Sequence, residues 1–565
     1  MSLRVILSAI VILVLVAIFR VIGDSDAADL VLTNGNIVTV DDGNPTAQAI
    51  AIREGKILAV GSAVAIDEFV GRQTEIIDLE GQTAIPGFIE GHAHFNGVGQ
   101  AQLQLNLMSV ANWDEVVAMV EEAANSAEPG ELILGRGWHQ EKWDRAPTPN
   151  VEGIPLHITL SAVSPDNPVL LTHVSGHAVY ANAKAMELSG IDNTTPDPSG
   201  GEIIRDGMGN PIGYFRETAS RLLALAREGA TPTDPRRVVE LAQEEALSKG
   251  ITSFQDAGSS FEQIDIFKEM AEDGSLDIRL WVMVRESVAE LTENLAEYRM
   301  IGVGEDRLTV RAIKMAIDGA LGSHGAWLLE PYADLSESAG LNTSDLEDAA
   351  ATAELAIEHG YQFAMHAIGD RGNRETLDMF QWAFDNNPDE EDLRWRIEHA
   401  QNLHPDDIPR FENMQVIAAM QGVHATSDGP WITDRLGQER VERGAYVWRD
   451  LIDAGVIIGN GTDAPVEDVD PIASYYSSVS RMMSNGEVLT PRQKMTRMEA
   501  LKSYTINNAY AGFEEDIKGS LEVGKLADIT VLDRDILTIP EEDIPNTTIS
   551  YTIVGGEVMY SGNNN

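Results

Sequence analysis

Two histidines separated by one residue, His92 and His94, follow the apolar run 85–89. Side chains two positions apart in an extended strand point to the same face. The two imidazoles could therefore bind one divalent metal ion together. For an isolated pair of this kind, a polar loop with two incidental histidines is the more common explanation. The residues that follow other apolar runs decide between the two.

Four further candidates for metal binding lie in or just after later apolar runs: Lys314, His366, His399 and Asp463. In a parallel barrel the catalytic groups sit at the C-terminal ends of the strands. A charged or imidazole side chain at the end of an apolar run needs a partner or a function. It is improbable that five predicted strand ends carry such side chains by coincidence. The chain has no cysteine, so a metal must be held by histidine, carboxylate or modified lysine.

The elements that must position these residues alternate between strand-like and helical patterns. Strand-like windows lie at 250–256, 278–284, 308–317, 362–368, 394–399, 415–421 and 455–461. Amphipathic stretches such as 235–249, 346–359 and 373–386 lie between most of them. With the strand before His92 this makes eight β/α units, the number that closes a parallel barrel. The segment of about 103–237 is too long for one crossover and is predicted to be an insert after the first strand.

Short strand-like windows occur at both ends of the chain, at 30–39, 48–53, 55–61, 74–78, 82–85, 527–532 and 549–560. Neither group can cover both of its faces alone, which favours one β-sandwich built from both. The predicted fold class is therefore α/β: a (β/α)8 TIM-like barrel with a β-sandwich from the N- and C-terminal segments. The predicted sandwich comprises 28–84 and 516–565, and the barrel 85–515.

The composition of the 565 residues, with 43% hydrophobic and 23% charged, is typical of a globular protein. Ninety acidic residues against 40 basic ones give a net charge of −50, which excludes an electrostatic preference for nucleic acid or anionic membranes. Arg4 and the apolar run 5–19 predict a signal peptide, residues 1–27, cleaved after Ala27. An uncleaved membrane anchor is the alternative. Either predicts a secreted or periplasmic protein. The sequence leaves a homodimer open.

Several motifs resemble the metal-dependent amidohydrolase superfamily. They are Pro86-Gly-Phe-Ile-Glu-Gly-His-Ala-His94, Gly461-Thr-Asp463-Ala-Pro465 and Gly519-Ser-Leu-Glu-Val-Gly-Lys-Leu-Ala-Asp528. The surroundings of Lys314, His366-Ala-Ile-Gly-Asp370, Ile397-Glu-His399-Ala-Gln401 and Gly135-Arg-Gly-Trp138 are similar to its YtcJ-like branch, amidohydrolase family 3, which includes N-substituted formamide deformylases. The resemblance runs from about residue 30 to residue 560. It implies a hydrolase that cleaves a non-peptide carbon–nitrogen bond, in an amide, N-acyl or N-formyl group, of a small-molecule substrate.

The resemblance also implies a set of metal ligands. His92 and His94 would bind one ion with Asp463, and His366 and His399 a second, with Lys314 as a bridging carbamate (N6-carboxylysine). A Lys314 paired with Asp318, and a site with one metal ion, are the alternatives. Zinc suits these ligands, although manganese, iron, cobalt or nickel are compatible.

The predicted mechanism is attack of a metal-activated water on a carbonyl carbon. Asp463 is the expected general base and then acid, and His424 the expected donor to the oxyanion, with a plain loop histidine as the alternative. Residues expected to bind substrate are His177, Arg136, Trp138 and His324, although core packing suits Trp138 better. The ligands do not specify the leaving group, so an esterase, lactonase or phosphotriesterase is the alternative. A metal-storage protein would need no proton shuttle.

Overall fold

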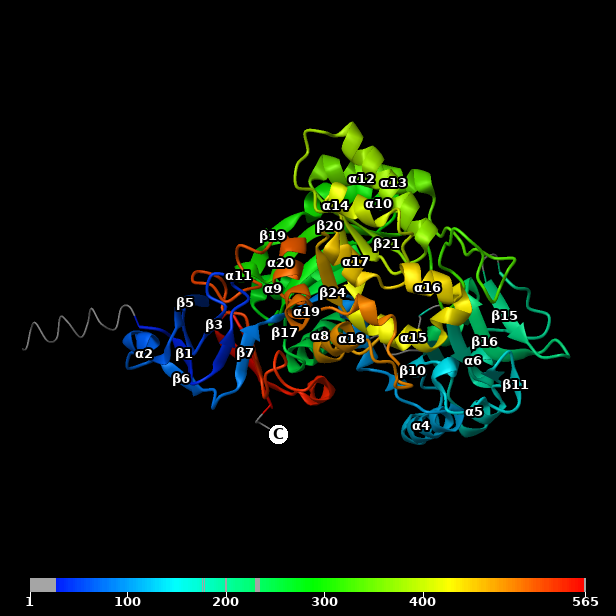
Figure 1. The fold of residues 1–565 in the computed structure, drawn as a ribbon. Helices are drawn as coiled ribbons and strands as arrows, with labels where there is room; N and C mark the ends of the chain where they lie inside the picture. Colours follow the sequence, from blue (N-terminus) through cyan, green and yellow to red (C-terminus); the bar gives the residue numbers. More distant parts are fainter. Residues whose placement is uncertain (1–26, 175, 177, 199–200, 229–233, 563–565) are drawn as a thin grey trace, which may run out of the picture.

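The computed structural model describes residues 27–174, 176, 178–198, 201–228 and 234–562 (Figure 1). The signal peptide or anchor predicted at the N-terminus lies outside these residues, apart from Ala27. Among the described helices none is long and apolar enough to cross a membrane.

A parallel barrel forms the centre of the described chain. Its eight strands, in spatial order, are β8 (Phe88–Ala93), β17 (Ile251–Ser259), β18 (Arg279–Val284), β20 (Leu308–Ala316), β21 (Gln362–Ala367), β22 (Arg396–His399), β23 (Ile417–Gln421) and β24 (Ile458–Gly461). Asp463 donates its backbone N–H to the carbonyl of His92 at 2.7 Å, and His94 donates to that of Ala464 at 2.7 Å. These bonds bring the first strand against the last, and the predicted (β/α)8 barrel is confirmed.

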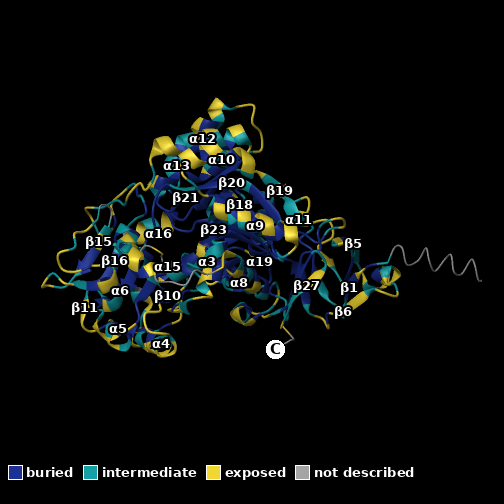
Figure 2. Cartoon of the chain, turned by 180° about the vertical axis from the view of Figure 1, so that it is seen from behind, coloured by how far each residue is buried: buried dark blue, intermediate teal, exposed yellow. Residues whose placement is uncertain are grey.

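Helices cover the outside of the barrel, so its strands are buried on both faces (Figure 2). This burial is why the strands appear in the sequence as almost continuous apolar runs. The predicted helical stretches correspond to α8 (Pro235–Ser248), α12 (Leu346–His359) and α13 (Asp370–Asn386). The helix α9 (Phe261–Asp273) begins at a capping box of Ser260 and Gln263 and ends at Gly274, whose φ of 79° is a left-handed conformation.

Two sheets beside the barrel combine both ends of the chain. One has the order β5 (Lys56–Gly61), β4 (Ala49–Arg53), β1 (Leu30–Thr33) and β6 (Glu75–Asp78). The other has the order β27 (Glu557–Ser561), β26 (Ile549–Val554), β25 (Ile529–Leu532), β7 (Thr83–Pro86), β2 (Asn36–Val38) and β3 (Thr46–Ala47). Because β25 pairs antiparallel with β7, the predicted composite sandwich is confirmed. The residue boundaries given for the sandwich and barrel stay a prediction.

The insert after the first barrel strand is a folded unit with its own sheet and core. Its sheet has the order β15 (Gly201–Arg205), β16 (Pro211–Glu217), β14 (Ala178–Ala181), β13 (Val169–His173), β10 (Ile133–Trp138) and β9 (Leu105–Asn106). The helices α4 (Trp113–Ser126) and α5 (Ile158–Val163) contribute apolar side chains to this core. Figure 1 shows the insert on the side of the barrel opposite the sandwich.

Candidate metal centre

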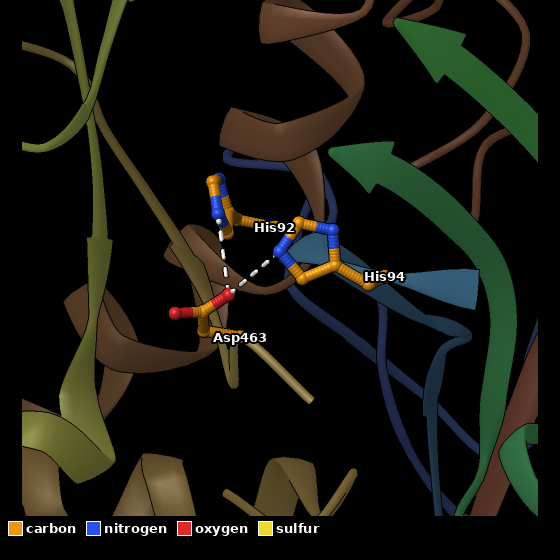
Figure 3. A group of neighbouring side chains, drawn as sticks. All are labelled: His92, His94 and Asp463. Atoms are coloured by element: carbon orange, nitrogen blue, oxygen red, sulfur yellow. Dashed lines mark ion pairs between the residues drawn. The ribbon is translucent and has the colours of Figure 1, made fainter. Parts of the chain in front are cut away.

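His92, His94 and Asp463 form the first group of converging ligand atoms (Figure 3). His92 lies near the end of β8, His94 follows that strand, and Asp463 follows β24. The Nε2 atoms of His92 and His94 lie 3.5 Å and 3.4 Å from Oδ1 of Asp463. Strand ends far apart in the sequence thus meet because β8 and β24 close the barrel.

His399 and His424 form a second group with the same aspartate. His399 ends β22, and His424 lies in the first turn of α15 (Gly422–Leu436). Their rings are stacked with centroids 6.1 Å apart and an interplanar angle of 7°. Nε2 of His424 lies 3.9 Å from Oδ2 of Asp463. Asp463 therefore faces one group with each of its oxygens.

His366 and Lys314 lie beside these groups without completing either. The His366 ring is centred 4.4 Å from that of His399, and its Nε2 lies 3.5 Å from Oδ1 of Asp318. Nζ of Lys314 is buried and donates to the carbonyl of Ala257 at 3.5 Å. Burial lowers the pKa of Lys314 to about 8, against the opposing effect of nearby carboxylates.

The alternative pairing of Lys314 with Asp318 is not formed. Asp318 accepts the backbone N–H groups of Trp327, Ile368 and Gly369 at 2.7–2.9 Å. These bonds fix the loops that follow β20 and β21 and place the carboxylate beside His366.

Several ligand atoms at this centre are buried and have no hydrogen-bond partner among the described residues: Nε2 of His92, His366 and His424, and Oδ1 of Asp463. Unsatisfied lone pairs are costly in a protein interior, and a cation would satisfy all of those that converge. Burial lowers the pKa of His366 and of His399 well below the usual value, which keeps both in the neutral form that binds metal. Burial opposes ionisation of Asp463, but the imidazoles of His92 and His94 bring its pKa well below the usual range. The donors therefore fit a divalent cation.

Three residues that support the ligands are missing from the sequence predictions. Glu398 accepts a hydrogen bond from Nδ1 of His92, and Arg396 binds Glu398. Gln421 accepts from Nδ1 of His399 at 2.7 Å. Burial opposes ionisation of Glu398, yet the charge of Arg396 and the contact with His92, which includes a hydrogen bond, lower its pKa far below the usual value. The signal in the sequence is that Arg396 and Glu398 alternate with apolar residues inside a buried strand.

The model for the amidohydrolase family matches residues 75–560. The chain belongs to the amidohydrolase family. As an amidohydrolase it is a hydrolase acting on carbon–nitrogen bonds, as the sequence predicts.

Relatives and solved structures resemble this amidohydrolase over almost its whole length. Protein LONG AFTER FAR-RED 3 of Arabidopsis thaliana is 31% identical, over 94% of this chain and 92% of that protein. The putative amidohydrolase YtcJ of Bacillus subtilis is 30% identical, over 93% of this chain and 98% of that protein. The N-substituted formamide deformylase of Arthrobacter pascens is 27% identical, over 94% of this chain and 98% of that protein. The crystal structure of an uncharacterized metal-dependent hydrolase from Pyrococcus horikoshii has a TM-score of 0.72 at 28% identity and covers 91% of this chain and 99% of that chain. The predicted YtcJ-like branch is confirmed.

The residues expected to bind substrate lie in different places in this amidohydrolase. Arg136, on β10, donates to the carbonyls of Pro465 at 3.4 Å and Val174 at 3.2 Å, which places its guanidinium beside the loop that carries Asp463. His324 has its Nε2 3.1 Å from Oδ1 of Asp334 and is about one quarter exposed. His177 lies outside the described residues.

Trp138 lies in the core of the insert, the alternative that the sequence favoured over contact with substrate. Its ring is fully buried in the insert and its N–H donates to the carbonyl of Leu171 at 3.1 Å. Its ring contacts those of Tyr180, Tyr214 and Trp143. Trp138 is therefore a core residue, because its indole is fully buried among other aromatic rings.

Proposed function

We propose that this amidohydrolase hydrolyses an amide, N-acyl or N-formyl bond of a small molecule with the help of one or two divalent metal ions, zinc being the best suited. The ligands would be His92, His94, Lys314, His366, His399 and Asp463. The observation that carries the proposal is the position of Asp463, whose two oxygens face the two groups of histidines. Similarity to a formamide deformylase supports the N-formyl class.

Lys314 is proposed to carry a carboxylate on Nζ. The neutral amine attacks the carbon of carbon dioxide. An N–C bond forms as one C=O π bond opens to give an anionic oxygen, and the nitrogen loses a proton to solvent. With a pKa of about 8, about a tenth of the lysine is neutral at pH 7, far more than for an exposed lysine. The anionic product suits a site with two cations whose other proposed ligands include a single carboxylate, that of Asp463.

The chemistry that a bound metal supplies is Lewis acidity, which lowers the pKa of coordinated water to about 7. Asp463, held as an anion, accepts the proton of the attacking water and delivers it to the leaving nitrogen as the carbon–nitrogen bond breaks. His424, beside Asp463, donates to the oxyanion. Arg136 binds a polar group of the substrate, since its guanidinium lies next to the loop that carries Asp463. His324 and His177 are proposed from the sequence to bind substrate.

The test combines metal analysis with a substrate panel. Purified protein is expected to contain one to two zinc-like ions per chain and to hydrolyse some N-formyl or N-acetyl amines. Removal of the metal with a chelator should abolish turnover, and added zinc should restore it. A folded protein that binds no metal would refute the proposal. Aryl esters that turn over faster than every amide would replace it with an esterase function.

The role of His424 is tested separately by His424→Gln. An oxyanion donor predicts unchanged metal content with a lower kcat. A fall in metal content would instead make His424 a ligand, in line with its position in the second group.

Export from the cytoplasm is proposed from the N-terminal sequence alone. N-terminal sequencing of protein secreted by its host is expected to begin at Ala28. A start at residue 1 or 2 would favour the retained anchor. Light scattering of the purified protein measures whether it is a homodimer.

A further inference from the structure

An ion pair inside the barrel lies directly beneath the first group of ligands. Arg396 and Glu398 are two residues apart on β22, so both point into the barrel, and both are fully buried. Nε and Nη2 of Arg396 contact Glu398. Arg396 also donates to the carbonyl of Gly91 at 2.7 Å and to Oε1 of Gln255 at 2.6 Å. The guanidinium thus joins three barrel strands, β8, β17 and β22, and holds Glu398 in one place.

Glu398 fixes the tautomer of His92. An ionised carboxylate can only accept hydrogen bonds, so Nδ1 of His92, which contacts Oε2 of Glu398, carries the hydrogen. In the neutral ring, the form that binds metal, Nε2 then carries the lone pair, and this atom faces Asp463 and has no hydrogen-bond partner among the described residues. The ring is held in the form and direction that a metal ligand needs.

The second group has a neutral partner at the equivalent position. Nδ1 of His399 donates to Oε1 of Gln421 at 2.7 Å. The amide nitrogen of Gln421 donates to the carbonyl of Ala419 at 3.1 Å, which fixes the direction of the amide. Two imidazoles with ring centroids 4.8 Å apart are therefore supported by partners of different charge, a carboxylate for His92 and an amide for His399. A carboxylate partner makes an imidazole the stronger ligand.

We infer that Glu398 is a positioning residue for His92, and that it makes the His92–His94–Asp463 position bind its metal ion more tightly than the position that includes His399. The inference rests on the proposed function, because it requires that the centre binds metal. It predicts an order of metal binding: the His92–His94–Asp463 position binds the first zinc ion and is the last to lose it.

The test measures zinc affinity in the variant Glu398→Gln, which keeps the size of the side chain and removes its charge. Metal-free protein is titrated with zinc in competition with a fluorescent chelator. The tighter of the wild-type affinities is expected to fall by about 10–100-fold in this variant. In the control Glu499→Gln, a carboxylate on the outer helix α19 (Arg497–Ser503) that binds Arg449, zinc affinity should stay unchanged. The reciprocal variant Gln421→Glu should tighten the weaker position.

Two further measurements keep the inference testable if Arg396 without its partner disturbs folding. The double variant Arg396→Met with Glu398→Gln removes both charges and should show the same loss of zinc affinity. In the wild-type protein, imidazole nitrogen NMR should find His92 protonated on Nδ1, with His92→Gln to assign the signal. Unchanged zinc affinity in the variants, or a proton on Nε2 of metal-free His92, would overturn the inference. A folded wild-type protein that binds no zinc would instead refute the proposed function.

Discussion

Replacing Asp463 with asparagine removes the negative charge and most of the proton-accepting capacity of this side chain while keeping its size and one carbonyl oxygen. In the wild-type structure Oδ1 lies 3.5 Å and 3.4 Å from Nε2 of His92 and of His94, and Oδ2 lies 3.9 Å from Nε2 of His424. The variant should therefore separate the two roles proposed for Asp463, because the histidines still bind metal and the amide cannot accept the proton.

The expected magnitude follows from the proton transfer. General acid–base catalysis contributes about 10²–10⁴-fold, which corresponds to roughly 3–5 kcal/mol of activation free energy at 1.36 kcal/mol per decade. We expect kcat in Asp463→Asn to fall by about this factor. Metal content should fall much less, since His92 is held by β8 and by Glu398 and His94 directly follows β8, and neither support involves the side chain of Asp463.

The assay measures kcat on the best N-formyl or N-acetyl amine of the panel, with metal content determined on the same samples. Asp468→Asn is the matched control: it lies in the same loop, is exposed, and binds Lys249 at 3.2 Å on the surface, so its kcat should equal that of the wild type. The reasoning is refuted if Asp463→Asn keeps more than about a tenth of the wild-type kcat with its metal in place. It is equally refuted if excess zinc restores full activity, because Asp463 would then be a ligand alone.

Three further changes test the site and the fold. Protein prepared without carbon dioxide should gain metal content and activity when bicarbonate is added, whereas Lys314→Met should gain neither, and an equal response in both would exclude the carbamate. Burial raises the pKa of Glu90 from 4.5 to about 8, so its favourable contribution to folding is complete below pH 4.5 and is lost as the pH rises through 8. In urea unfolding of metal-free protein, Glu90→Gln should lose about 3–4 kcal/mol less than the wild type between pH 5 and 8, and parallel pH profiles of the two proteins would contradict this. Arg279 binds Asp528 through two hydrogen bonds of 2.7 Å and 3.0 Å in a buried pair between β18 and the sandwich. Arg279→Met should cost about 3–5 kcal/mol of unfolding free energy and Arg279→Met with Asp528→Leu much less, whereas a loss below about 1 kcal/mol in the single variant would show that the pair is dispensable.

The barrel, the composite sandwich and the strand ends that carry the candidate ligands could all be predicted from the amino-acid sequence. This was possible because strands buried on both faces require continuous apolar runs, and a histidine or aspartate that ends such a run is visible without knowing its neighbours. The spacing of His92 and His94 fixed their common face, since alternation along a strand is a local property. The resemblance to the amidohydrolase superfamily implied Asp463 as their partner, and the closure of the last barrel strand on the first brings it to them.

Only the tertiary structure decided how those ligands are supported. The contact between Glu398 and His92 joins residues 306 positions apart, and it depends on how β22 and β8 are placed across the barrel interior. The same holds for His424, which approaches Asp463 through the direction in which α15 leaves β23. Trp138 is buried because the insert folds into a separate core, and Asp318 is bonded to backbone amides instead of to Lys314. Hydrogen bonds and packing between distant segments depend on strand order and loop geometry, which no local pattern of residue types contains.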